Sequence, residues 1–206
     1  MHNRRPIVIK LGGSFAFSPD LKAWITAIAH GAGRVVIVPG GGPFADQVRA
    51  AQARMGFDDR TAHRMALLAM EQYGCAIKSL HKVLSLADTP GAIRRGLASG
   101  EVPVWLPLRM ALDVSDIPQS WDVTSDSLAA WLAGKIGAAR LLLVKHVELE
   151  NETACASDLM ARDVIDRAFA NVLAASGVPA FIVGPKDRRA VGRLGSGAPP
   201  GIPIIP

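Results

Sequence analysis

Two glycine-rich segments near the N-terminus carry the residues best suited to chemistry. Each is an apolar run that ends in glycines and precedes a predicted helix. The polar and glycine positions are Lys10, Gly12, Gly13 and Ser14 in the first segment, and Gly40, Gly41 and Gly42 in the second. Backbone N–H groups at such strand-to-helix turns point toward an anion. We therefore expect two phosphate-binding loops with a lysine between them, which indicates phosphoryl-transfer chemistry.

Lys10 ends an apolar run, where burial of its ammonium group is costly unless the group meets an anion. The two glycines that follow would let the backbone approach a phosphate closely. The segment is not a GxxxxGK[ST] loop, because the lysine precedes the glycines. The alternative is a lysine that reaches solvent beside an ordinary glycine turn.

Three consecutive glycines at residues 40–42 are entropically costly unless a ligand approaches the backbone. Phe44 and Ala45 break the GxGxxG pattern, which argues against a dinucleotide site. A simple tight turn is the alternative. Three polar residues on the predicted helix that follows are expected at the surface rather than in the site: Asp46, Gln47 and Arg49.

Asp126 falls in the first turn of a predicted helix that Thr124 or Ser125 would cap. Its carboxylate either stabilises the positive end of the helix dipole or holds active-site lysines toward a phosphoryl group. Lys145 ends the apolar run 141–145 as Lys10 ends the first run. The carboxyl ends of parallel strands meet at the edge where open α/β sheets bind ligands. We therefore predict Lys10, Asp126 and Lys145 as catalytic residues.

Two further residues are candidates for substrate binding. His63 lies in the strongly helical stretch 59–74, where a packed structural histidine is the alternative. Arg109 comes just after another apolar run and would pair with an acceptor phosphate. His146 follows Lys145 and is either a further functional residue or a solvated loop residue.

Apolar runs alternate with helical patterns along the whole chain, which predicts an α/β fold. We expect a single domain with a three-layer αβα sandwich and a mostly parallel central sheet. The strands are expected at residues 6–11, 34–39, 83–87, 102–106, 140–145 and 179–184. The helices are expected at residues 19–31, 43–55, 59–80, 90–99, 124–137, 162–176 and 186–193. The proline-rich tail, residues 195–206, is expected to form a final edge strand or a loose end.

Composition limits the other classes of function. The formal net charge is +5, but the basic residues are scattered and aromatic residues are few, so no nucleic acid partner is expected. Apolar stretches are too short for a membrane span, and the first residues lack a secretory signal, which predicts a cytoplasmic protein without a membrane partner. Cys75 and Cys155 lack metal-site spacing and are expected to be buried or incidental thiols.

The sequence resembles the amino acid kinase family, which includes acetylglutamate, aspartate, uridylate and isopentenyl phosphate kinases. Three motifs carry the resemblance, at residues 9–14, 38–42 and 124–130 leading into 141–144. It implies ATP and Mg²⁺ as cofactors, no protein metal site, and a homo-oligomer. It also implies that Lys10, Gly12 and Gly13 contact ATP phosphates, with Ser14 and Lys145 as further phosphate-binding candidates. The second glycine loop would hold the acceptor or the transferring phosphoryl group, and Asp126 would orient the lysines.

Residues 38–46 and 63–74 look most like the branch of the family that acts in methanofuran biosynthesis. That branch phosphorylates [5-(aminomethyl)furan-3-yl]methyl phosphate, so the resemblance implies an acceptor with a phosphate and an amine. An acceptor-binding part is expected at about residues 1–120, and a nucleotide-binding part at about 121–206.

The sequence departs from the family in its second half. The usual Asp-Val-Asp-Gly segment reads His146-Val-Glu-Leu149, and no Gly-Gly-Met-x-x-Lys motif is visible at residues 156–163. Either Lys145 replaces the missing cation, or the protein is a non-catalytic binder of nucleotides or phosphometabolites on a kinase fold. Arg162 is a further candidate cation that could equally cap a helix.

Overall fold

The computed structural model describes residues 5–147, 153–194 and 199–205. In these residues an eight-stranded sheet has the strand order β3-β4-β2-β1-β5-β7-β8-β6. All neighbouring strands are parallel except β7 and β8. The strands are β1 (Ile7–Leu11), β2 (Val35–Pro39), β3 (Leu84–Ala87), β4 (Val102–Trp105), β5 (Arg140–Val144), β6 (Ala154–Cys155), β7 (Ala180–Val183) and β8 (Ile202–Ile205).

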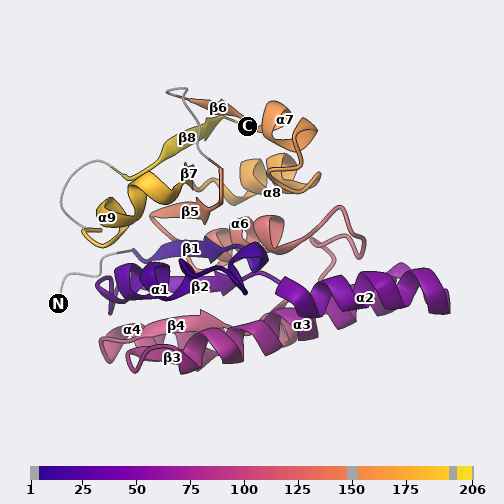
Figure 1. Ribbon diagram of the computed structural model, residues 1–206, viewed down its shortest axis with the longest axis horizontal. Helices are drawn as coiled ribbons and strands as arrows, with labels where there is room; N and C mark the ends of the chain where they lie inside the picture. The colour runs from indigo at the N-terminus through magenta and orange to yellow at the C-terminus, as the bar shows by residue number, and fades with distance from the viewer. Residues whose placement is uncertain (1–4, 148–152, 195–198, 206) are drawn as a thin grey trace.

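Helices cover both faces of the sheet, which confirms the predicted αβα sandwich (Figure 1). The α-helices are α1 (Leu21–Ala29), α2 (Gly42–Met55), α3 (Asp59–Ser79), α4 (Pro90–Ala98), α5 (Leu108–Ala111), α6 (Ser125–Lys135), α7 (Ala156–Ala161), α8 (Phe169–Ser176) and α9 (Arg188–Val191). Two short 3₁₀ helices are η1 (Gly13–Phe15) and η2 (Pro185–Asp187). No α-helix among the described residues is long and apolar enough to cross a bilayer.

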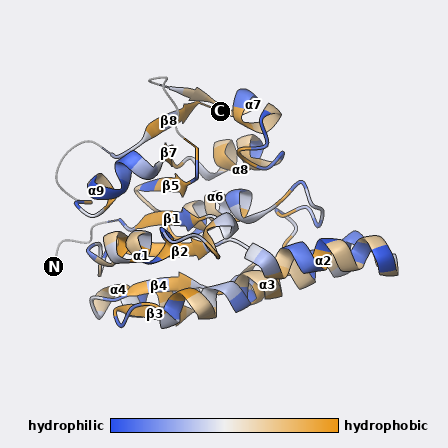
Figure 2. Ribbon diagram, viewed as in Figure 1, coloured by the Kyte–Doolittle hydropathy of each residue, from blue (hydrophilic) through white to orange (hydrophobic). Residues whose placement is uncertain are grey.

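Side-chain alternation along the strands creates two hydrophobic cores, one on each face of the sheet. On β1, Val8 packs into the core beside α6 and α8, whereas Ile7 and Ile9 pack into the core beside α1. On β5, Leu141 and Leu143 share the face of Val8. The strands are apolar on both faces (Figure 2), as expected for a covered parallel sheet.

All six predicted strands are present, and the first five predicted helices lie within two residues of their expected bounds. The predicted helix 162–176 is wrong in its first half. Arg162 ends α7, Asp163 has a φ of 52°, and α8 starts only at Phe169. A left-handed residue interrupts a helix, so this segment turns instead of continuing.

The C-terminal part also differs from the prediction. The predicted helix 186–193 is a short 3₁₀ turn followed by a single turn of helix, η2 and α9. The tail does form a strand, β8, but it is not the edge, because β6 pairs with its other side. Cys75 and Cys155 are exposed free thiols rather than buried ones.

Candidate active site

Two lysines share one buried carboxylate at the carboxyl edge of the sheet. Lys10 Nζ lies 2.8 Å from Asp126 Oδ1, and Lys145 Nζ lies 2.8 Å from Asp126 Oδ2. The side chains of Lys10, Asp126 and Lys145 are 6%, 6% and 15% exposed. Two ammonium groups against one carboxylate leave one net positive charge largely out of solvent. Such a charge is stable only beside an anion, so the cluster is built to receive one.

Strand alternation explains why the lysines meet. Lys10 is two residues after Val8 and therefore points to the same face, toward α6. Lys145 follows Leu141 and Leu143 with the same two-residue period. Since β1 and β5 are neighbouring parallel strands, both lysines reach the N-terminus of α6, where Asp126 lies.

The charges of this cluster shift its pKa values in opposite senses. Burial alone would raise the pKa of Asp126, but the charges of Lys10 and Lys145 outweigh it and lower that pKa to about 2. Burial and the charge of Lys10 lower the pKa of Lys145 to about 8, although Asp126 opposes the change. The carboxylate of Asp126 is therefore ionised near neutral pH, whereas the ammonium group of Lys145 loses its proton at a pH only slightly above neutral.

Asp166, which sequence reasoning missed, fixes the N-terminus of α6. Its carboxylate accepts hydrogen bonds from Thr124 N (2.9 Å), Thr124 Oγ1 (2.8 Å), Ser127 N (2.9 Å) and Ser127 Oγ. Thr124 is the N-cap residue, one of the two positions expected, but its hydroxyl donates to Asp166 and makes no side-chain capping bond to the helix. Burial, together with the charge of Asp126, raises the pKa of Asp166. A carboxylate brought from 39 residues downstream of Ser127 thus does the work of a helix cap.

The two glycine loops pack directly against each other. A Cβ atom on Gly13 would lie 2.7 Å from Gly42 Cα, and one on Gly40 would lie 2.9 Å from Gly13 Cα. Gly42, the first residue of α2, has a φ of +54°, which L side chains rarely adopt. These glycines therefore let the two loops approach each other closely. This contact brings the backbones of both loops together.

We expect the substitution Gly13→Ala to destabilise the protein by roughly 2–3 kcal/mol, because the new methyl group would overlap the backbone of Gly42. Gly12→Ala is the matched control. Gly12 has a φ of −59°, and a Cβ there meets only ordinary contacts at 3.5 Å or more. Urea unfolding of both variants measures the difference. Equal midpoints for the two variants would contradict the packing of the loops.

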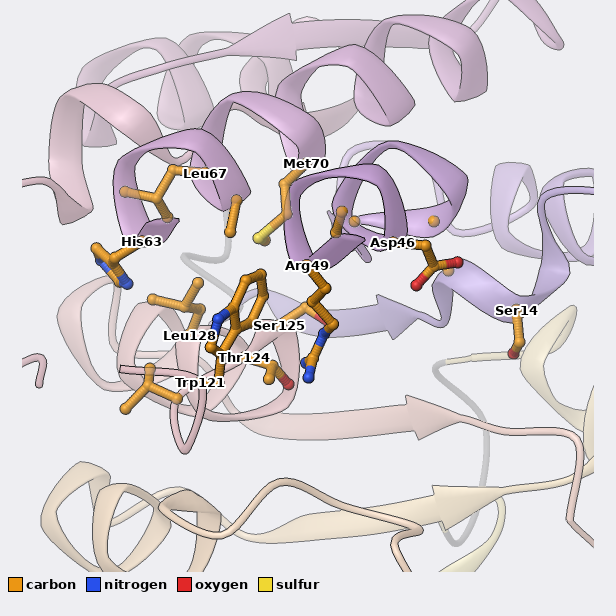
Figure 3. Close-up of a pocket in the computed structure, with 16 residues that line it drawn as sticks. Ser14, Asp46, Arg49, His63, Leu67, Met70, Trp121, Thr124, Ser125 and Leu128 are labelled. Carbon is orange, nitrogen blue, oxygen red and sulfur yellow. The ribbon is translucent and has the colours of Figure 1, made fainter. Parts of the chain in front are cut away.

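A cavity of about 300 Å³ opens beside the loops (Figure 3). It lies between α2 and α3 on one side and the start of α6 with its preceding segment on the other. At one end are Gly13, Ser14, Gly41 and Gly42. The other lining residues are Ala45, Asp46, Arg49, His63, Ala66, Leu67, Met70, Trp121, Val123, Thr124, Ser125 and Leu128. The cavity is thus lined from both halves of the chain.

His63 lies at the apolar end of the cavity, near Leu67 and Leu128 (Figure 3). The residue is 5% exposed, and its Nε2 has no hydrogen-bond partner among the described residues. Burial lowers the pKa of His63, so the imidazole is neutral at neutral pH. An unpartnered ring nitrogen in a cavity wall is suited to bind a polar group of a ligand.

The structure does not bring Arg109 to this cavity. Arg109 lies on α5 with a side chain that is 69% exposed, and its guanidinium pairs with Asp88 at 3.2 Å. Asp46 and Arg49, which were expected at the surface rather than in the site, lie at the cavity. Both are exposed, as expected, but both line the cavity. One turn separates them on α2, and that spacing places them on one face of the helix.

The second half of the chain supplies Lys145 but no further cation to the cluster among the described residues. His146 is exposed, as the reading of a solvated loop residue expects, and its ring stacks on Phe15 with a ring separation of 3.7 Å. Arg162 is the exposed C-cap of α7. Glu148 and Leu149, which belong to the segment 146–149 that differs from the usual family motif, lie outside the described residues.

Buried positive charge beside two backbone loops suits a protein that handles phosphoryl groups, and the comparisons agree on a phosphotransferase class. The uridylate kinase of Archaeoglobus fulgidus has a similar structure, with a TM-score of 0.71 at 17% identity, covering 97% of this chain and 100% of that one. The UMP kinase of Ureaplasma parvum gives a TM-score of 0.70 at 14% identity, covering 99% and 100%. These likenesses confirm the fold.

A model of the amino acid kinase family matches residues 5–149, and the chain belongs to that family. The [5-(aminomethyl)furan-3-yl]methyl phosphate kinase of Methanocaldococcus jannaschii is 25% identical over 143 residues. This match covers 68% of the chain and 66% of the relative, so the chain spans just under two thirds of that relative's length.

Proposed function

We propose that this protein is an ATP-dependent kinase that transfers the γ-phosphoryl group to a small metabolite bearing a phosphate or a carboxylate. The observation that carries the proposal is the surplus buried positive charge of Lys10 and Lys145 around Asp126, next to two glycine loops. Phosphoryl transfer asks mainly for positioning and for neutralisation of negative charge, and this cluster offers both.

In the proposed reaction an oxygen of the acceptor attacks the γ-phosphorus of ATP, and the bond to the β-phosphate oxygen breaks, so that ADP leaves with the electron pair. Lys10 and Lys145 would face the transferring group, because Asp126 holds both ammonium groups at one point. The backbone N–H groups of the two loops would stabilise its equatorial oxygens. An ionised phosphate or carboxylate acceptor needs no strong base, and the mechanism uses none.

Magnesium would enter with the nucleotide. No group of three or more metal-ligating side chains occurs in the part of the chain that the structure describes. Mg²⁺ is commonly held by substrate phosphates with few protein ligands, which fits such a site. When bound, the ion would neutralise charge on the ATP phosphates.

The acceptor that we propose is [5-(aminomethyl)furan-3-yl]methyl phosphate, the compound in the name of the M. jannaschii relative. Its phosphate would lie at the glycine-loop end, and its flat ring would lie between Met70 and Trp121. Its amine would reach the His63 end, where the unpartnered Nε2 can accept a hydrogen bond. The proposal also includes a cytoplasmic location and a homo-oligomeric assembly.

The direct test is magnesium-dependent transfer from ATP to a panel of acceptors that includes this furan phosphate, UMP and small carboxylates. Turnover of one acceptor supports the proposal. If none is phosphorylated while ATP still binds, the alternative of a non-catalytic binder holds. That alternative is motivated by the absence of a second lysine motif at residues 156–163.

Activity should depend on the protonation of Lys145. Because its pKa is about 8 in the free protein, we expect kcat/KM for ATP to fall about tenfold per pH unit above pH 8, as the ammonium loses its proton. Lys145→Arg stays charged and should lose this descending limb. The exposed Lys135→Arg is the control and should keep it. A wild-type profile that is flat to pH 9.5 would contradict the assignment.

A further inference from the structure

Arg49 is the one lysine or arginine among the residues that line the cavity. Lys10 and Lys145 are not among the lining residues, and both are engaged by Asp126. Among the lining residues, Arg49 therefore supplies the one permanent positive side-chain charge that an anionic acceptor meets in this cavity. Arg49 makes no ion pair with any residue in the described parts of the chain.

An indole holds the guanidinium of Arg49 in place. Its Cζ lies 4.0 Å from the centre of the Trp121 ring, and Figure 3 shows the guanidinium beside that ring and near Thr124. Trp121 is in turn fixed to α2, because its Nε1 donates to Gln52 Oε1 at 2.6 Å. Arginine stacked on an aromatic face keeps its in-plane N–H donors available. The guanidinium is therefore oriented in advance, and its exposed N–H donors can exchange water for a ligand.

The carboxylate of Asp46 places a negative charge in the same cavity as Arg49. Asp46 lies one turn earlier on α2, between Arg49 and Ser14 in Figure 3. A phosphate at this end of the cavity would be repelled by Asp46 unless a neighbouring cation compensated it. Arg49 is that cation.

We propose that Arg49, held by Trp121, binds the phosphate that the acceptor already carries and so selects phosphorylated acceptors over their alcohols. This inference rests on the proposed function. Guanidinium binds a phosphate through paired N–H donors, so the site recognises the shape of the anion as well as its charge. The acceptor oxygen that attacks ATP would belong to the phosphate that Arg49 holds.

The test compares binding of the furan phosphate and of the corresponding alcohol, measured by titration calorimetry, in wild type and variants. We expect Arg49→Gln to weaken binding of the phosphate by roughly 10–100-fold and to leave binding of the alcohol within about twofold. Arg49→Lys should recover part of the loss, because it keeps the charge but not the paired donors. Arg54→Gln, on the last turn of α2 and outside the cavity lining, is the matched control and should behave as wild type.

The outcomes separate this inference from the proposed function. If Arg49 only supports Trp121, Arg49→Gln will weaken phosphate and alcohol alike, which overturns the inference. Unchanged binding of the phosphate in Arg49→Gln overturns it as well. Failure of the wild type to transfer a phosphoryl group, with phosphate binding that still depends on Arg49, overturns the kinase proposal but not this binding role. A wild type that does not bind the furan phosphate overturns this inference, whereas the kinase proposal still depends on transfer to the other acceptors of the panel.

Discussion

Replacing Lys10 by methionine should lower kcat for phosphoryl transfer at least about a hundredfold, equivalent to roughly 2.7 kcal/mol of transition-state stabilisation. The variant keeps the apolar stem of a side chain that is 6% exposed but removes its charge. Asp126 and Lys145 would then form a neutral pair, and the surplus positive charge that faces the phosphoryl group would disappear. Steady-state kinetics with saturating ATP and acceptor measures the loss.

A matched control separates this effect from a general effect of surface charge. Lys135 forms an ion pair with Asp116 at 3.1 Å, and both side chains are about half exposed. Lys135→Met should retain kcat within about twofold, since exposed pairs contribute little. A kcat for Lys10→Met within tenfold of wild type, in a folded protein, would refute the role of the lysine.

The sequence predicted the cluster because its signals are local. Lys10 and Lys145 each end a buried strand, and the two-residue period of a strand determines which face each one uses. Asp126 opens a helix that leads into β5, and helix N-termini lie at the carboxyl edge of a parallel sheet. These patterns can be read without knowing which segments meet. The glycine loops are also visible as local patterns. The reason for their glycines is not local, because each loop needs glycine to make room for the backbone of the other.

The residues that sequence reasoning missed all depend on contacts between distant segments. Asp166 caps a helix that begins 41 residues earlier, and Trp121 stacks on Arg49 from 72 residues away. Neither pairing has a local pattern, since a lone aspartate in a loop and a tryptophan before a helix are common. A left-handed Asp163 before Asp166 also explains why the predicted helix 162–176 fails. The tertiary use of Asp166 overrides the helical pattern.

Contacts between distant segments also explain why the prediction of Arg109 as a substrate-binding residue is not supported by its position. A basic residue just past a strand is a reasonable candidate for the ligand-binding edge, and β4 does end there. However, β4 lies two strands away from β1 in the sheet, with β2 between them, and α5 directs Arg109 toward Asp88. Strand order, which is not visible in a single sequence, decides which strand end reaches the cluster.

The second large effect is expected for Asp126→Asn, which should lower both activity and stability. Without the carboxylate, the ammonium groups of Lys10 and Lys145 would face each other unpaired in a buried site. Removing one partner of a buried charge cluster typically costs about 3–5 kcal/mol. We also expect kcat to fall at least about a hundredfold, because nothing would then orient the two lysines.

The pH dependence of unfolding identifies the cause. Unpaired burial lowers the pKa values of the lysines in the folded state, while the unfolded state keeps ordinary values. The unfolded state then binds more protons, so the free energy of unfolding of Asp126→Asn should rise between pH 7 and pH 9.5, and more steeply than that of wild type. Urea unfolding at the two pH values measures this rise. If the loss of stability comes instead from altered packing at the start of α6, the free energy of unfolding of Asp126→Asn should change with pH as that of wild type does.

The double variant Lys10→Met/Asp126→Asn tests whether repulsion between the lysines causes the loss of stability, because it leaves only one buried ammonium group where Asp126→Asn leaves two. If repulsion between unpaired lysines causes the loss of stability, the double variant should be more stable at pH 7 than Asp126→Asn alone, although it carries one more substitution. Residues in contact are expected to show such non-additive effects. Additive losses in this cycle would mean that Asp126 acts through helix packing rather than through the charges that it holds together.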